Sequence, residues 1–68
     1  MDSIFSIQTQ REYDPKDAVR IVDWYQIQLY LHYGAVLLDI YSSNGKIVAV
    51  FDRKDTKELY KLWRERKL

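Results

Sequence analysis

Hydrophobic and polar residues alternate most regularly in residues 35–51, AVLLDIYSSNGKIVAVF. Asn44-Gly45 is the preferred pair for a two-residue type I′ turn, because both central positions of that turn need positive φ. A turn at this pair predicts an antiparallel hairpin with Leu38 opposite Phe51. One face of the hairpin is then entirely apolar, as a half-buried sheet requires. Its residues are Val36, Leu38, Ile40, Ile47, Ala49 and Phe51.

The opposite face of the hairpin is mixed, but it is more apolar than a fully solvated face. It carries Leu37, Asp39, Tyr41, Lys46, Val48 and Val50. Two interpretations are open: either the N-terminal segment covers this face or its apolar residues are ordinary surface residues, or the face is a surface for self-association or for a partner. In the second case the partner-binding residues are Leu37, Tyr41, Val48 and Val50.

A helix is predicted after the hairpin, over residues 56–67. Asp55 and Glu58 have the spacing of a capping box, which places the helix start at Thr56. The apolar residues of this segment form one narrow stripe at positions i, i+3 and i+4, namely Leu59, Leu62 and Trp63. We expect this stripe to pack above four hairpin residues: Leu38, Ile40, Ile47 and Phe51.

A second helix is predicted over residues 24–33, before the hairpin. Asp23 and Gln26 form a capping box at its start. Gly34 suits the left-handed position that follows the last turn of many helices. These signals fix both ends of the segment.

The segment upstream of this helix is ambiguous. Asp14-Pro15 is a good helix start, whereas AVRIV within residues 15–22 is rich in β-branched residues and is typical of a strand. Residues 1–12 are an edge strand or a flexible arm. Together the patterns predict an α+β fold: a small single-layer antiparallel sheet, made of hairpin 35–51 and an N-terminal strand, packed against two helices.

The composition changes this picture in two ways. Sixty-eight residues form one domain, residues 1–68, and without cysteine it has no disulfide or thiolate metal site. Dense aromatic packing and oligomerisation are the remaining ways to stabilise so small a chain. We expect a homodimer. The lack of cysteine, of a signal-peptide pattern and of an apolar run of about 18 residues predicts a cytoplasmic protein without a membrane segment.

Candidate catalytic groups are few. His32 is the single imidazole of the chain, and it lies between aromatic residues near a helix end. A packed or surface histidine is far commoner there than a catalytic one. Gly34 and Gly45 are accounted for by a helix end and a turn, so they form no phosphate-binding loop. We predict that the protein is not an enzyme and uses no metal or cofactor.

Charge is distributed unevenly along the chain. Residues 1–52 carry four basic and seven acidic side chains, whereas residues 53–68 carry seven basic and three acidic ones. A basic C-terminal helix is able to contact the phosphates of a nucleic acid. The candidate nucleic-acid-binding residues are Lys57, Lys61, Arg64 and Lys67. No recognised nucleic-acid-binding motif accompanies them.

The order of residues also resembles a group of small uncharacterised proteins encoded by bacteriophages and integrated mobile elements of bacteria. The likeness covers residues 19–68. It rests on Val19-Arg20-Ile21, Gln26 or Gln28, Tyr30-Leu31, Tyr33-Gly34, Asp39-Ile40-Tyr41, Lys46-Ile47-Val48, Val50-Phe51-Asp52, Thr56-Lys57 and Trp63. The resemblance implies a strand–helix–hairpin–helix order, a phage or prophage origin and a cytoplasmic site of action, and it carries no catalytic residue across.

These observations lead to two expected functions. The first is a non-enzymatic phage or prophage accessory protein that acts by binding another protein, from the host or the phage. The alternative is a nucleic-acid-binding protein that uses the basic C-terminal helix.

Overall fold

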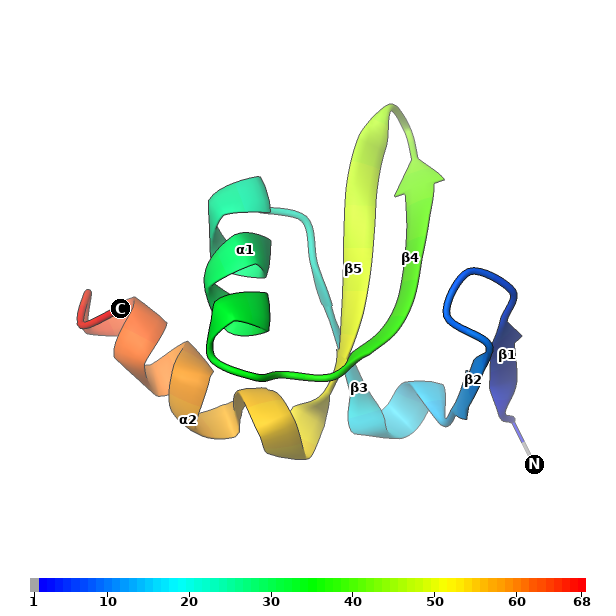
Figure 1. Cartoon of the computed structure of the whole chain (residues 1–68), viewed down its shortest axis with the longest axis horizontal. Helices are drawn as coiled ribbons and strands as arrows, with labels where there is room; N and C mark the ends of the chain where they lie inside the picture. The colour runs from blue at the N-terminus through cyan, green and yellow to red at the C-terminus, as the bar shows by residue number, and fades with distance from the viewer. Residues whose placement is uncertain (1) are drawn as a thin grey trace.

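The computed structural model describes residues 2–68, and in these residues the chain forms the predicted α+β fold (Figure 1). The molecule is elongated, with extents of 35 × 26 × 17 Å, and the two ends of the chain lie at opposite ends of it. Its elements are β1 (Ile4–Ser6), β2 (Arg11–Tyr13), a 3₁₀ turn (Pro15–Asp17), β3 (Ala18–Ile21), α1 (Trp24–His32), β4 (Leu37–Ser43), β5 (Lys46–Asp52) and α2 (Arg53–Arg64).

Three of the strands form one antiparallel sheet in the order β3-β5-β4. The strand interpretation of AVRIV is therefore confirmed, because β3 pairs with β5 from Ala18 opposite Asp52 to Ile21 opposite Ala49. The first two strands, β1 and β2, pair only with each other and form a separate small hairpin. Residues 1–12 were expected to form an edge strand or an arm; their described part contributes to this second hairpin.

The turn between β4 and β5 is the one that the sequence predicts. Asn44 and Gly45 both have positive φ, at 51° and 77°, which is the requirement of a type I′ turn. The pairs that follow the turn match the expected register as far as Asp39 opposite Val50. Glycine matters at the second position because it adopts positive φ without steric cost.

Further from the turn, a β-bulge changes the register. Asp39 pairs with Val50, but Leu37 rather than Leu38 pairs with Phe51, so Leu38 is an extra residue on β4. A bulge disturbs the alternation of side chains along a strand. The prediction that Leu38 lies opposite Phe51 is therefore wrong, and Leu37 packs on the helix side of the sheet while Leu38 packs on the other side.

The helices cover one face of the sheet and bury the larger core. Its fully or nearly buried residues are Ile27, Tyr30, Ala35, Ala49 and Phe51. The rings of Tyr30 and Phe51 meet edge to face with centroids 5.6 Å apart, a favourable aromatic geometry. Leu59 and Trp63 of α2 pack against this core, as expected. Ile47 does not lie beneath them, because it is 48% exposed near the hairpin tip.

The N-terminal hairpin covers part of the other face. Tyr13, Ala18 and Val50 form a second, smaller buried cluster, and Leu38 and Tyr41 pack against it. The interpretation that the N-terminal segment covers this face is therefore confirmed.

Both helices begin at an aspartate. Asp23 caps α1 by accepting hydrogen bonds from the backbone N–H of Tyr25 and Gln26 at 3.0 and 3.2 Å, as predicted. The cap of α2 is Asp52 rather than Asp55, and the helix starts three residues before the predicted position. Asp55 lies within α2 and accepts from the backbone N–H of Val36, 3.1 Å away, which ties α2 to the start of β4.

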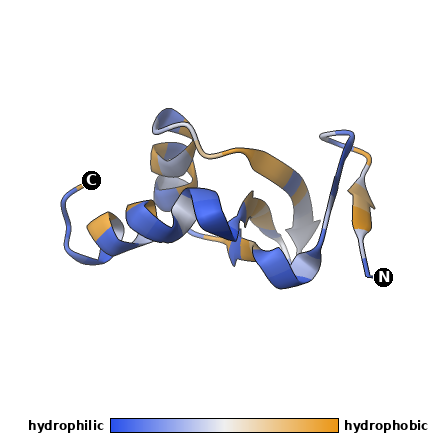
Figure 2. Cartoon of the chain, turned by 90° about the horizontal axis from the view of Figure 1, so that it is seen from below, coloured by the Kyte–Doolittle hydropathy of each residue, from blue (hydrophilic) through white to orange (hydrophobic). Residues whose placement is uncertain are grey.

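The C-terminal end of α2 also differs from the prediction. The helix ends at Arg64, and Arg66 takes a left-handed conformation with φ of 56°. The backbone N–H of Arg66 donates to Trp63 O, and that of Lys67 donates to Leu62 O at 2.8 Å. This hydrogen-bond pattern is a Schellman motif. Figure 2 shows that most of the α2 ribbon has the colour of hydrophilic residues. No helix in residues 2–68 is long and apolar enough to cross a membrane.

Candidate functional site

The four residues predicted to bind a partner do not form one exposed surface. Val48 and Val50 are buried, at 6% and 0% exposure. Leu37 packs against the helix-side core, whereas Tyr41 packs on the opposite side of the sheet beside the N-terminal hairpin. The bulge in β4 separates Leu37 from the other three. The predicted surface is therefore corrected: it is mostly interior.

A buried carboxylate occupies the centre of that covered face. Asp39 is 7% exposed and accepts hydrogen bonds from Ser6 Oγ at 2.6 Å, Tyr13 Oη at 2.8 Å and the backbone N–H of Ile40 at 2.8 Å. Ser6 and Tyr13 belong to the N-terminal hairpin. Thr9 in the loop of the same hairpin donates to Leu38 O at 2.6 Å. The hairpin is thus fastened to β4 through polar contacts.

These contacts shift two pKa values. Burial by itself raises the pKa of Asp39, but the hydrogen bonds from Ser6, Tyr13 and the backbone of Ile40 outweigh it, and the net pKa lies below the ordinary 3.8. Burial, together with the hydrogen bond to Asp39 and its negative charge, raises the pKa of Tyr13 to about 12. Asp39 is therefore ionised and Tyr13 is protonated at neutral pH. Because Asp39 and Tyr13 each have a hydrogen-bond partner within the fold, this cluster stabilises the folded structure.

A hollow on the surface lies between β3, α1 and α2. It has a volume of about 550 Å³, and none of its lining residues is acidic. Those residues are Val19, Arg20, Ile21, Tyr30, Arg53, Thr56, Lys57 and Tyr60. We call this hollow the β3–α2 pocket.

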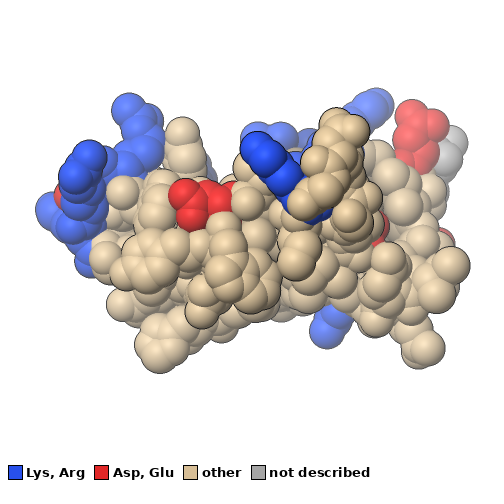
Figure 3. All heavy atoms as spheres, turned by 90° about the horizontal axis from the view of Figure 1, so that it is seen from above, with Lys and Arg blue, Asp and Glu red and all other residues tan. Residues whose placement is uncertain are grey.

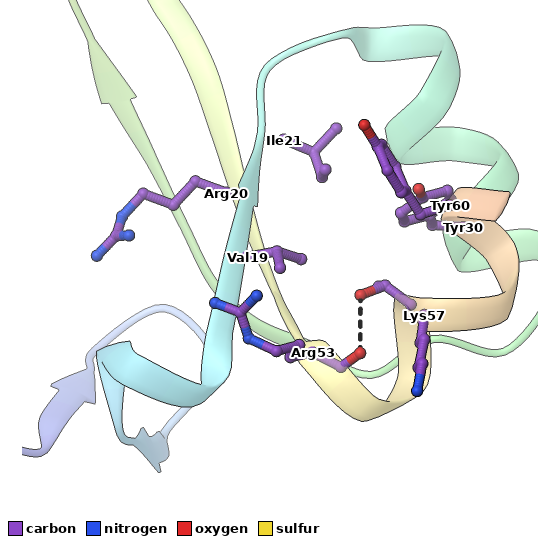
Figure 4. Close-up of a pocket in the computed structure, with 8 residues that line it drawn as sticks. Val19, Arg20, Ile21, Tyr30, Arg53, Lys57 and Tyr60 are labelled. Atoms are coloured by element: carbon purple, nitrogen blue, oxygen red, sulfur yellow. Dashed lines mark hydrogen bonds between the residues drawn. The ribbon is translucent and has the colours of Figure 1, made fainter. Parts of the chain in front are cut away.

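The side chains of the β3–α2 pocket are arranged with an apolar floor and cations at the rim (Figure 4). Val19 and Ile21 point from β3 toward the two helices, where the rings of Tyr30 and Tyr60 lie close together. Arg53 lies beside β3, and its Nη2 is 3.5 Å from the carbonyl oxygens of Lys16 and Ala18. The side chain of Arg20 points to the other side of the strand.

The hydroxyl of Tyr30 is a buried polar group of this pocket. It accepts a hydrogen bond from Gln26 Nε2 at 2.9 Å. Burial raises the pKa of Tyr30, the hydrogen bond from Gln26 opposes that shift, and nearby Tyr60 adds to it. Tyr30 is thus neutral and held in place in the wall of the pocket, whereas Tyr60 is 51% exposed and free to contact a ligand.

The predicted basic stripe is present in part. Lys57, Lys61 and Arg64 are exposed along α2, at the spacing that places side chains on one helix face. Tyr60 lies among them, with the Arg64 guanidinium carbon 5.8 Å from its ring centroid. Lys67 does not belong to the stripe, because it lies beyond the end of the helix and pairs with Glu65 at 3.3 Å. Figure 3 shows the basic side chains gathered at this end of the molecule.

The β3–α2 pocket was not predicted from the sequence. Its residues come from three separate elements, and only the folded chain brings them together. The available signal was the spacing of Arg53, Lys57 and Lys61, which is that of one helix face. It was missed because the predicted helix start at Thr56 left Arg53 outside the helix. Within residues 2–68, no three histidine, aspartate or glutamate side chains lie close enough together to hold a metal ion. The chain matches no protein-family model, no curated protein and no solved structure.

Proposed function

We propose that this chain is a non-enzymatic binding module, and that its β3–α2 pocket takes an extended, acidic segment of another protein. The observation that supports this most is the pocket itself, which joins an apolar floor, two rim cations and the free edge of a sheet. Its chemistry fits a peptide with one apolar anchor side chain flanked by carboxylates.

The first step of the argument concerns the sheet edge. Among the described residues, β3 pairs with β5 on one side and with no strand on the other. An unpaired edge presents backbone N–H and C=O groups to an incoming strand. Extended peptides bind other proteins by adding a strand at such an edge. A peptide beside β3 would also cover the adjoining pocket.

The second step concerns charge. Arg53 and Lys57 are exposed, and neither has an ion-pair partner within residues 2–68. Carboxylates of a bound segment would meet these two cations at the rim. Rim charges contribute chiefly to specificity and to the rate of association.

The third step concerns the anchor. A bound apolar side chain would rest on Val19 and Ile21, against the half-exposed ring of Tyr60. Aromatic residues at the centre of a contact carry much of the binding energy in protein interfaces. We expect a single anchor and a short strand to give micromolar affinity.

The test uses a display library of decapeptides in which Asp or Glu alternates with apolar residues. A selected peptide is titrated into ¹⁵N-labelled protein. We expect the largest chemical-shift changes at β3 and around Tyr60, and slower amide exchange along the free edge of β3. Arg53→Glu and Lys57→Glu should each weaken binding at least tenfold, because they reverse a rim charge.

Lys46→Glu is the matched control, since Lys46 is an exposed cation at the far tip of the hairpin. It should leave peptide affinity within twofold. Equal loss in all three variants would mean that only net charge matters. If no peptide of the library binds at millimolar concentration, the proposal is also contradicted.

A second candidate function rests on the stripe of α2. Lys57, Lys61 and Arg64 flank an exposed Tyr60, which combines phosphate contacts with a ring on which a base stacks. Three phosphate contacts predict a slope near −3 for log K against log salt on duplex DNA, since each contributes about −0.9. Lys61→Glu separates the two functions: it should abolish nucleic-acid binding and spare the peptide, whereas Arg53→Glu should do the reverse.

The setting of this function follows from the resemblance alone. We infer that the protein is an accessory protein of a phage or prophage and acts in the cytoplasm of the bacterial host. On this proposal it performs no catalysis and needs no cofactor, and its partner is a host or phage protein.

A further inference from the structure

Helix α1 carries no formal charge, because its sequence, WYQIQLYLH, contains no Asp, Glu, Lys or Arg. Its polar residues are Gln26, Gln28 and His32, and the other six are apolar. A surface helix normally turns charged and polar residues to the solvent. Here Gln26, Ile27 and Tyr30 are buried, whereas Trp24 and Tyr25 are 55% and 61% exposed. One long face of α1 is therefore largely exposed, although the ring of Tyr25 at its border packs against that of Trp63 of α2, with centroids 5.9 Å apart.

The exposed residues of α1 lie on one side of the helix. Trp24, Gln28 and Leu31 follow each other at i, i+4 and i+7, so they form a single stripe. Tyr25 and His32 border this stripe. We call these five residues the α1 outer face.

From this face we infer that two copies of the chain pair through α1, with the helices antiparallel about a two-fold axis at Gln28. Gln28 is the middle residue of Trp24–His32. In a two-fold pair it meets its own copy, and a primary amide is self-complementary because it both donates and accepts. Residues equally far from Gln28 are then level with each other, so Trp24 of one copy lies beside His32 of the other, and Tyr25 beside Leu31.

Charge favours a second copy as the occupant. The outer face carries no formal charge when His32 is neutral, and the whole chain has a net charge of +1. Two copies therefore approach with little repulsion. In the antiparallel arrangement the two helix macrodipoles also oppose each other, which is favourable.

The exposed area fits a small dimer. The chain exposes 5179 Å², whereas a compact monomer of 8.2 kDa is expected to expose about 4,500 Å². The excess is close to the roughly 800 Å² that each partner buries in a standard interface. The two exposed rings supply roughly 200–250 Å², and the rest of the face brings the contribution to the order of 500 Å² per chain. A total near 1,000 Å² is at the low end of specific interfaces and predicts a weak dimer.

Sedimentation equilibrium from 5 to 500 μM tests the pairing. The average mass should rise from 8.2 kDa toward twice that value. Gln28→Glu and Gln28→Lys each place like charges at the axis and should keep the chain monomeric up to 500 μM. An equimolar mixture of the two variants should restore a dimer, because opposite charges then meet. Ile7→Glu is the matched control: Ile7 is 81% exposed on the N-terminal hairpin and its change should leave the dimer intact.

A crosslink measures the geometry directly. Helix axes 8–10 Å apart place facing Cα atoms about 4–6 Å apart, within the range of a disulfide. The chain has no cysteine, so Gln28→Cys should give a disulfide-linked dimer under mild oxidation at low micromolar concentration, and Ile7→Cys should not. A parent chain that stays monomeric at 500 μM overturns the inference. So does a mixture of the two charge variants that fails to pair, or a dimer that is lost in Ile7→Glu. Peptide binding at the β3–α2 pocket is measured separately, so failure of one proposal leaves the other standing.

Discussion

The two faces of the three-stranded sheet are covered in different ways. On the helix side, the contacts are apolar and include the fully buried residues Ile27, Tyr30 and Phe51. On the other side, a two-stranded hairpin is fastened largely by hydrogen bonds to Asp39 and Leu38. Apolar contacts are non-directional and add up with area, whereas buried hydrogen bonds depend on each partner being present.

This difference indicates which part of the molecule is able to unfold locally while the rest stays folded. Loss of the helix-side core removes the only large apolar cluster that the described chain contains. Loss of the Asp39 contacts frees the N-terminal hairpin but leaves that cluster in place. Regions held by few apolar contacts open at lower free energy than the core. The N-terminal hairpin is thus the first candidate for local opening.

The largest expected effect comes from Phe51→Ala. Phe51 is fully buried and packs against Tyr30, so truncation should lower the free energy of unfolding by about 3–5 kcal/mol. A domain of this size has little stability to spare, so the variant should be largely unfolded. Urea unfolding followed by circular dichroism measures the change. Ile7→Ala on the exposed hairpin should alter stability by less than about 0.5 kcal/mol. Similar losses in both variants would contradict the comparison.

A smaller effect is expected from Asp39→Asn. The amide keeps the shape of the carboxylate but presents an NH₂ group to hydroxyl and N–H donors, so part of the network is left unpaired. We expect a loss of about 1–3 kcal/mol, concentrated in the N-terminal hairpin. Amide hydrogen exchange should accelerate in β1 and β2 while the amides of Ile27 and Tyr30 stay protected. Uniform acceleration through α1 would show that the two faces unfold together.

The smallest effect is the pH dependence of the same contacts. Because the pKa of Asp39 is lowered in the folded state, its contribution is present above its ordinary value of 3.8 and is lost as the pH falls through the folded pKa. The pKa of Tyr13 is raised from 10.0 to about 12, so its contribution is complete below pH 10 and is lost as the pH rises through about 12. Denaturant titrations from acid to alkaline pH should show both declines. In Asp39→Asn, the alkaline decline should begin nearer pH 10, and an unchanged profile would rule out the link between the two groups.

Local signals in the sequence determined much of this fold. The Asn44-Gly45 turn and the cap of α1 at Asp23 are present as predicted. Each depends on the conformational preference of a few neighbouring residues, which holds in any context that allows the element to form. The α+β class followed from such signals. The pattern of AVRIV left strand and helix open, and the order strand, helix, hairpin, helix was implied by the resemblance; the structure has the strand.

Other features were decided only by the tertiary structure. Asp52 and Asp55 are both suitable N-cap residues for α2. Asp52 is the N-cap in the structure, because Asp55 instead accepts a hydrogen bond from the backbone N–H of Val36, which is distant in the sequence. The bulge, which reverses the sides on which Leu37 and Leu38 were expected, is a property of the paired strands, and alternation along one strand does not reveal it. The β3–α2 pocket likewise needs three elements that are far apart in the chain. Short-range preferences set which elements form, whereas contacts between distant residues set which faces they bury.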